Sequence, residues 1–429
     1  MSPHAAVCVP PEAASDAAAG AARRRKAVAF VRCSRQQEAA ELCRAIVEEE
    51  PGGPQWLADE VVAAMEQPDL GFAGDLAAIL TAIERGSAWR PAWMGGRTRP
   101  IGDASLSTGK LRHDLQQLLH LRHQEVAVPL DELIADYEAA LDRLARLGIT
   151  RAPLSGEDDR TIGRAYGRLV HIADAPRVEQ ALSPSWDRGL CQRRYLESRP
   201  GVVVIDNFLA PDALRSLLRF CQDSTIWAGN RYAHGRLSSL FFTGFNAPLV
   251  LQIAEEIRDA FPLLIGEHHP LRQLWAFKNT EVLPGDASIH ADFAAINVNF
   301  WITPDDANLH PDSGGMVVYD LEAPLSWSFR QYNERPDLIR ELIARHRPRA
   351  VRIPYRQNRA IIFNSDLFHG TEAVCFRPDY LSHRINVTML YGDRRRDEHR
   401  AEPEPAQRAS TELIAAWRSA ALTRRRSWT

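Results

Sequence analysis

Long apolar runs are missing from this sequence. No window approaches the roughly 18 apolar residues that a helix needs to span a bilayer, so no membrane partner is expected. Only residues 27–31 follow the basic cluster at 23–26 as an apolar patch. A secretory signal needs about 7 to 15 apolar residues there, so we expect a cytoplasmic protein.

Paired cysteines and a strong net charge are also missing. The six cysteines are scattered without a CxxC motif, which argues against a disulfide framework or a cysteine zinc site and favours reduced thiols in a cytoplasm. A formal net charge of -3 gives no global field that recruits nucleic acid, so no nucleic-acid partner is expected. The 45% of apolar residues and 25% of charged residues are ordinary for a soluble protein.

The 429 residues suit two domains plus tails. Residues 1–26 are rich in Ala, Pro and Ser and are expected to be a disordered tail. Over residues 27–194 apolar side chains recur every three or four positions, and Gly86 and Gly148 stand where helix C-caps would. Because no self-similar period is present, this region is predicted to be a plain helical bundle.

One stretch of the helical region, residues 109–125, is rich enough in histidine to suggest a metal site. It contains His113, Asp114, His120 and His123, but no pair has the i, i+4 spacing that clamps an ion on a helix. His113 and His120 share a face, whereas Asp114 is expected to point elsewhere. We therefore expect ordinary surface and interface histidines here.

Residues 195–392 change from a helical period to short strands. Residues 200–209 predict a buried strand, and Pro211 with Asp212 predicts the start of a helix. Six β-branched or aromatic runs follow, with one helix predicted near residues 336–345; the strand runs lie at 274–282, 296–303, 314–320, 350–355, 359–364 and 384–392. The predicted fold class is α+β, with a jelly roll (195–392) after the helical region. Residues 393–429 read as a charged tail with a possible short helix.

A candidate metal site emerges from residues 289–303, IHADFAAINVNFWIT. His290 and Asp292 are two residues apart and can reach one ion from one side of a strand. His369, expected in a loop after the run RAIIFN, supplies a third ligand. Two imidazoles and one carboxylate form the open facial set of iron(II) oxygenases. His310 and Asp312 have the same spacing but lie in a Pro-, Asn- and Gly-rich stretch, so we expect them in a surface loop.

The run HRINVTMLYG places Arg384, Asn386 and Thr388 on one face of a half-buried strand. A buried arginine needs an anion, either a dicarboxylate cosubstrate or an Asp or Glu partner. Asn297 and Asn299 alternate with apolar residues in the same way. They are candidate cosubstrate ligands together with Asn386, or they fill a polar barrel interior.

The segments HAD, FHGT and HRINVT, preceded by PGVVVIDNFLAPDALRSLLRFCQ, resemble the iron(II)- and 2-oxoglutarate-dependent dioxygenase superfamily, particularly its prolyl 4-hydroxylase-like bacterial members. The resemblance implies a double-stranded β-helix, Fe(II) bound by His290, Asp292 and His369, and Arg384 on the distal carboxylate of 2-oxoglutarate. It implies consumption of dioxygen and release of succinate and carbon dioxide, with ascorbate as a further candidate cofactor. Prolyl hydroxylases usually have lysine where Arg384 stands. The arginine therefore argues against a prolyl substrate but not against 2-oxoglutarate. Halogenating relatives lack the carboxylate of Asp292, so hydroxylation is favoured.

Two other classes of function remain open at this point. A cupin-type isomerase or lyase would use the metal without 2-oxoglutarate. A non-catalytic binding protein would keep the fold and work through its helical region. The substrate is not identified: a protein or peptide side chain is slightly preferred over a small metabolite, and the sequence does not indicate the oligomeric state.

Overall fold

The computed structural model describes residues 11–50, 53–86, 105–230, 235–285 and 289–394. Its helices are α1 (Pro11–Arg32), α2 (Gln36–Glu49), α3 (Gln55–Met65), α4 (Gly71–Arg85), α5 (Thr108–His123), α6 (Asp131–Arg146), α7 (Gly156–Arg160), α8 (Arg188–Glu197), α9 (Pro211–Asp223), α10 (Pro248–Ala260), α11 (Phe329–Asn333) and α12 (Pro336–His346). None of the described helices combines the length and the apolar character needed to cross a membrane.

The strands form antiparallel sheets. Six of them pair in the order β3-β9-β6-β11-β5-β4, a larger sheet made of β3 (Val202–Ile205), β9 (Ala360–Asn364), β6 (Ile296–Trp301), β11 (Arg384–Tyr391), β5 (Leu271–Asn279) and β4 (Arg236–Leu240). A smaller sheet has the order β10-β7-β8, made of β10 (Leu367–Thr371), β7 (Met316–Glu322) and β8 (Ala350–Ile353). Strands β1 (Ser105–Ser107) and β2 (Arg151–Pro153) pair beside the helices.

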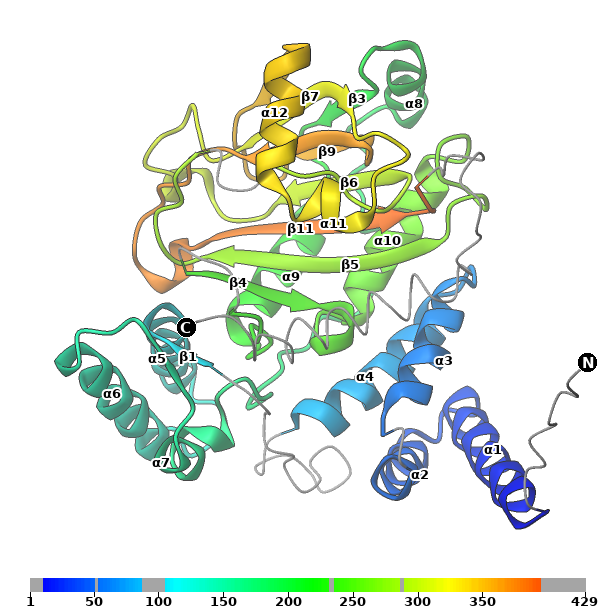
Figure 1. Cartoon of the computed structure of the whole chain (residues 1–429), viewed down its shortest axis with the longest axis vertical. Coiled ribbons are helices and arrows are strands. Elements are labelled where there is room, and N and C mark those ends of the chain that lie inside the picture. The colour runs from blue at the N-terminus through cyan, green and yellow to red at the C-terminus, as the bar shows by residue number, and fades with distance from the viewer. Residues whose placement is uncertain (1–10, 51–52, 87–104, 231–234, 286–288, 395–429) are drawn as a thin grey trace, which may run out of the picture.

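The larger sheet is covered on both faces because its side chains alternate between them. On one face Val298, Val387 and Met389 join the main core with α9 and α10. On the other face Trp301 and Phe363 pack against residues of the smaller sheet. Figure 1 shows α9 and α10 behind β4 and β5, and α11 and α12 beyond the opposite face. The space between the two sheets is therefore where an enclosed site can form.

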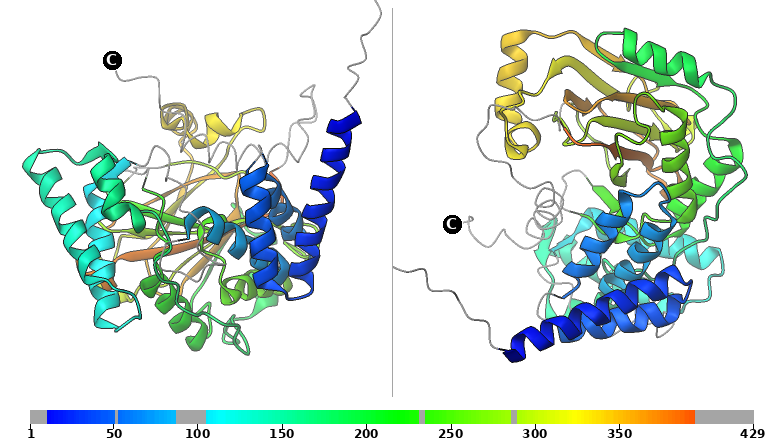
Figure 2. Two further views of the ribbon diagram at one scale, coloured as in Figure 1. Left: turned by 90° about the horizontal axis from the view of Figure 1, so that it is seen from below. Right: turned by 90° about the vertical axis from the view of Figure 1, so that its right-hand side faces the viewer.

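The helical region packs as two groups. Residues of α1 to α4 share one continuous core with α9, α10 and the larger sheet. Helices α5 and α6 have a smaller core of their own, and α5 also contacts α9. Figure 2 shows α1 to α4 and α5 to α7 on opposite sides of the chain below the sheet. Helices give way to strands near residue 195, but the main core runs across that position.

The N-terminal segment differs from the expected tail, because α1 begins at Pro11 and Ala27 and Val31 are buried. Alanine is the strongest helix former, so an Ala-rich stretch can be helical once it has a surface to pack on. Arg23 and Arg24 of the basic cluster pair with Glu49 and Glu50. Residues 1–10 and 395–429, which include the possible C-terminal helix, lie outside the described residues.

The six predicted strand runs are confirmed as β5, β6, β7, β8, β9 and β11, and the helix near residues 336–345 is α12. Strand β3 and helix α9, with Pro211 in its first turn, are also confirmed. Strand β4 and helix α10 were not anticipated. His369 lies on strand β10 and not in a loop, because the chain crosses from β9 in one sheet to β10 in the other within two residues.

Candidate metal and anion site

His290, Asp292 and His369 meet where the two sheets come together. His290 and His369 form an isolated antiparallel bridge, in which each backbone nitrogen donates to the other residue's carbonyl oxygen at 2.9 and 2.8 Å. The backbone nitrogen of Asp292 lies 3.0 Å from the carbonyl oxygen of Ser365 in the β9–β10 turn. One ligand atom from each side chain of the three lies within 4.8 Å of the others. The backbone thus fixes two imidazoles and one carboxylate in a common cluster, the His290–Asp292–His369 triad.

A hydrogen bond to the backbone fixes which ring nitrogen of His369 faces the other two side chains of the triad. Nδ1 of His369 is 2.9 Å from the carbonyl oxygen of Leu367, which places the proton on Nδ1 and leaves Nε2 as the metal-facing atom. Nε2 of His369 lies 3.4 Å from Oδ2 of Asp292, and Nε2 of His290 lies 3.6 Å from Oδ1. Each carboxylate oxygen therefore faces one imidazole.

Burial and charge compete at Asp292. Burial opposes ionisation, but the close contacts with His369 and His290 and the hydrogen bond from Asn297 together lower the pKa of its carboxyl. The Asp292 and His369 side chains are 7% and 4% exposed, whereas that of His290 is 27% exposed. The triad is therefore an anionic ligand set with its accessible side at His290.

Arg384 is buried between the two sheets, on the same face of the larger sheet as Asn386 and Thr388. Its Nε donates to the carbonyl oxygen of Gly314 at 2.7 Å and its Nη1 to Oδ1 of Asn386 at 3.0 Å. Burial lowers the pKa of its guanidinium to about 9, so it stays charged at neutral pH. Among the described residues no carboxylate pairs with Arg384. The structural ion pair considered from the sequence is therefore not formed within the described part of the chain.

Two buried donors near Arg384 also lack an acceptor. Nε1 of Trp301 and Nδ2 of Asn279 have no hydrogen-bond partner within the described ranges. Asn279 is directly opposite Arg384 in the register of β5 and β11, and the Trp301 ring lies 5.6 Å from the Arg384 guanidinium carbon. A buried cation and two unsatisfied donors at one place are the surroundings that an anion with several acceptor oxygens requires.

Four other basic side chains of the two sheets and their connections are neutralised or point away from this place. Arg352 pairs with Glu372 at 2.8 Å, while Arg356 and Arg359 both pair with Asp206. Lys278 lies inside β5 and is fully buried. Its neighbour Asn279 faces Arg384, so Lys278 points to the opposite, helix-covered face of the sheet.

The asparagines proposed as cosubstrate ligands occupy the wall between the triad and Arg384. Nδ2 of Asn297 donates to Asp292, and Nδ2 of Asn299 donates to Oδ1 of Asn297. Asn386 receives a hydrogen bond from Arg384 and faces Asn299. All three asparagines are buried. Asn297 thus contacts the side chain of Asp292, and Asn299 contacts Asn297, which gives the two asparagines a role that the sequence did not suggest.

His310 and Asp312, the second pair with the same spacing, are exposed in the connection between β6 and β7. This agrees with the expected surface loop. The backbone at His310 is held by Asn308. The two HxD motifs therefore differ in burial and in the presence of a distant histidine, as the strand pattern around each predicts.

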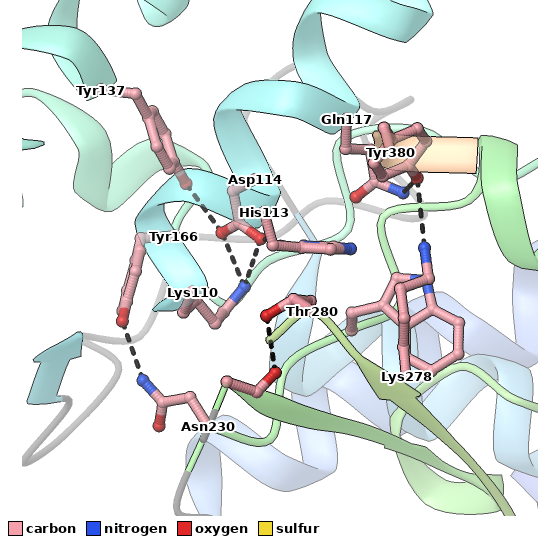
Figure 3. A network of polar contacts seen from close by, with 12 residues as sticks. Lys110, His113, Asp114, Gln117, Tyr137, Tyr166, Asn230, Lys278, Thr280 and Tyr380 are labelled. Atoms are coloured by element: carbon pink, nitrogen blue, oxygen red, sulfur yellow. Dashed lines mark hydrogen bonds and ion pairs between the residues drawn. The ribbon is translucent and has the colours of Figure 1, made fainter. Parts of the chain in front are cut away.

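His113 of α5 is an interface histidine, which agrees with the expectation, but Asp114 contacts it and does not point elsewhere. His113 is fully buried, and its Nδ1 lies 3.0 Å from Oδ1 of Asp114, whose carboxylate also accepts from Lys110 at 2.6 and 2.8 Å. Figure 3 shows this group facing Lys278 and Tyr380 across the contact between α5 and the sheet. Burial lowers the pKa of His113 to about 3, so it is neutral at physiological pH.

The other two histidines of α5 are simpler. Nε2 of His120 lies 2.8 Å from Asp223 on α9, and His123 is exposed. The α5 cluster as a whole joins a helix to the sheet, and its carboxylate is already paired with Lys110. It is a packing contact and not a second metal centre.

Comparisons with known proteins give structural likenesses only. No protein-family model matches the chain, and no curated protein matches it. The non-haem α-ketoglutarate dependent epimerase SnoN from nogalamycin biosynthesis is 14% identical over 50% of this chain and 87% of that chain, with a TM-score of 0.34. HygX from Streptomyces hygroscopicus, solved with nickel and 2-oxoglutarate, is 12% identical over 52% and 93%, with a TM-score of 0.34.

EctD from S. alaskensis, solved with 2-oxoglutarate and 5-hydroxyectoine, is 13% identical over 52% of this chain and 84% of that chain, with a TM-score of 0.32. TM-scores this low do not establish a common fold by themselves.

Proposed function

We propose that this protein is an iron(II)- and 2-oxoglutarate-dependent dioxygenase of the prolyl 4-hydroxylase-like type, with its two sheets forming a double-stranded β-helix. It would hydroxylate a C–H bond of a protein side chain or a small metabolite, consuming dioxygen and releasing succinate and carbon dioxide. One observation carries the proposal. The His290–Asp292–His369 triad is connected through buried asparagines of the larger sheet to Arg384, a buried cation without a carboxylate partner among the described residues.

The triad fits iron(II) by its chemistry. Two imidazole nitrogens and one carboxylate oxygen occupy one face of such an ion, and the remaining coordination positions serve the oxidation of a bound substrate by dioxygen. His369 would bind through Nε2, because Nδ1 is held by the Leu367 carbonyl. Asp292 would bind through Oδ1, because Oδ2 already accepts from Asn297 at 2.6 Å.

The surroundings of Arg384 fit the distal carboxylate of 2-oxoglutarate. A guanidinium donates charge-assisted hydrogen bonds to a carboxylate. Nε and Nη1 of Arg384 are already engaged by Gly314 and Asn386, which leaves Nη2 to face the anion. The unsatisfied donors of Trp301 and Asn279 are available beside it. These residues bind and orient the cosubstrate and exclude water from around its charge.

The test is formation of succinate from 2-oxoglutarate with added iron(II), followed with and without oxygen. We expect oxygen-dependent succinate in the wild-type protein and a loss of at least tenfold in His290→Ala and Asp292→Ala. The matched controls are His310→Ala and Asp312→Ala, which change the exposed second motif and should retain wild-type rates. Equal succinate formation in the triad variants and the controls would contradict the site assignment.

The substrate class can be identified by mass spectrometry of cell extracts. Proteins and small molecules from cells that express the wild-type chain are compared by mass spectrometry with those from cells that express Asp292→Ala. A gain of one oxygen atom on a peptide supports a protein substrate, and the same gain on a low-mass compound supports a metabolite. No oxygen gain in either fraction would contradict hydroxylation.

A further inference from the structure

A line of hydrogen bonds connects Arg384 to the metal-ligand carboxylate. Nη1 of Arg384 donates to Oδ1 of Asn386 at 3.0 Å, and Nδ2 of Asn386 lies 3.5 Å from Oδ1 of Asn299. Nδ2 of Asn299 donates to Oδ1 of Asn297 at 2.5 Å, and Nδ2 of Asn297 donates to Oδ2 of Asp292 at 2.6 Å. Every one of these side chains is buried. The line therefore runs through the protein interior from a cation to an anion.

The two ends fix the direction of the whole line. A guanidinium can only donate, so Asn386 must present its oxygen to Arg384 and its nitrogen to Asn299. An ionised carboxylate can only accept, so Asn297 must present its nitrogen to Asp292 and its oxygen to Asn299. Asn299 is then left with one orientation, which donates to Asn297 and accepts from Asn386. All three amide dipoles point the same way, and hydrogen bonds in such a line strengthen one another.

Thr388 adds a branch to this line. Its hydroxyl donates to Oδ1 of Asn299 at 2.8 Å, and Thr388 is directly opposite Asn299 in the register of β6 and β11. The branch holds the Asn299 oxygen from the side. Asn299 is thus the central member of the line, and its side chain bonds to Asn297, Asn386 and Thr388.

We propose that Asn299 is a positioning residue that links the two halves of the site. It orients Asn297, which holds Oδ2 of Asp292 and leaves Oδ1 for the metal ion. It also anchors Asn386, which orients the Arg384 guanidinium. This inference rests on the proposed function, because it assumes that a metal binds at Asp292. It replaces the direct cosubstrate contact expected for Asn297 and Asn299 with a role that acts through other side chains.

The test measures the dissociation constant for Mn(II), which needs no catalytic turnover. Removing an outer hydrogen-bond partner of a metal ligand typically weakens metal binding by about 10- to 100-fold. We expect Asn299→Leu to weaken Mn(II) binding by about tenfold. The control is Asn246→Leu, which removes two donated hydrogen bonds at Thr81 and Phe241, away from the site, and should bind Mn(II) like the wild type.

Asn299→Asp separates positioning from simple electrostatics. A carboxylate at this position can still accept from Thr388 and Asn386, but it cannot donate to Asn297. An added negative charge near the triad would by itself tighten the binding of a cation. The proposed role predicts the opposite sign, a weaker Mn(II) affinity than that of the wild type.

The outcomes distinguish the inference from the proposed function. Wild-type protein that binds no Mn(II) overturns both. Wild-type protein that binds Mn(II), together with Asn299→Leu within twofold of it, overturns the positioning role and leaves the metal site standing. Tighter Mn(II) binding by Asn299→Asp also overturns the positioning role. Weaker binding by both variants, with Asn246→Leu unchanged, supports it.

Discussion

The burial of Lys278 leads us to predict that the protein becomes more stable as the pH rises above 7. Its side chain is fully buried on the helix-covered face of β5. Nζ lies 3.3 Å from both the Cys221 carbonyl oxygen and the Tyr380 hydroxyl, and it stands over the rings of Trp227 and Tyr380 at 4.6 and 4.5 Å. No carboxylate pairs with it among the described residues. Burial lowers its pKa from 10.5 to about 7.

The sign follows from proton binding. Between pH 7 and 10.5 the unfolded chain holds a proton at Lys278 that the folded protein does not, so raising the pH through this window stabilises the folded state. Below pH 7 both states are protonated and the cost of burying the ammonium is constant. At about 1.4 kcal/mol per pH unit, the stability contributed by this one group changes by about 5 kcal/mol across the window.

Lys278→Met removes the charge and keeps the length of the side chain. The variant loses two hydrogen bonds, a cost of about 1–3 kcal/mol that does not depend on pH. Its unfolding free energy relative to the wild type should therefore rise by about 4 kcal/mol as the pH falls from 10 to 7. Other titrating groups cancel in the comparison.

The assay is urea unfolding followed by tryptophan fluorescence, for both proteins at a series of pH values between 7 and 10. The slope of the difference against pH is the measured quantity. A difference that stays constant across the series would mean that Lys278 keeps an ordinary pKa in the folded protein. The reasoning from its burial and aromatic neighbours would then be wrong.

Two further predictions concern charges with known partners. Lys110→Met should destabilise the protein by about 3–5 kcal/mol in the same urea assay, because it leaves the buried carboxylate of Asp114 unpaired, and a stability equal to the wild type would contradict that pairing. Arg384→Leu should weaken the affinity for 2-oxoglutarate by about 10- to 100-fold in calorimetry, because the charged partner of the distal carboxylate is lost. The Mn(II) affinity should stay within a few fold, because Arg384 bonds to Gly314 and Asn386 and not to a side chain of the triad. Unchanged turnover in Arg384→Leu would instead favour a metal enzyme that does not use 2-oxoglutarate.

The alternation of side chains along two strands was readable from sequence. Asn297 and Asn299 on β6 face the smaller sheet together with Arg384 and Asn386 on β11, while Val298 and Val387 face the helices. Alternation with a period of two is visible in the local sequence, so it can be predicted without knowing which strands lie beside it. The clustering of His290, Asp292 and His369 needed one more assumption, that the later strand returns beside the earlier one.

The hydrogen-bond and packing partners of the buried polar side chains could not be predicted from the sequence. Nothing in the sequence pairs Asn299 with Thr388 or places Lys278 against Trp227, because these contacts depend on the register between strands and on helix packing. The absence of an i, i+4 pair predicts ordinary surface and interface histidines in α5, but it does not predict that His113 is fully buried. Strand β10, which carries His369, was also not predicted, because it follows β9 after only two residues and pairs in the other sheet.

The helical layer and the site are connected through two pairs of adjacent residues. Lys278 faces the helices and Asn279, the next residue, faces Arg384. His383 immediately precedes Arg384, and its ring lies 6.1 Å from that of His113 on α5. Because adjacent residues of a strand share one backbone, the packing of α5 against the sheet also bears on the strand ends that carry Asn279 and Arg384. Lys278→Met touches only the helix-covered face, so a change in its 2-oxoglutarate affinity would show that this connection operates, and an unchanged affinity would show that the two faces are independent.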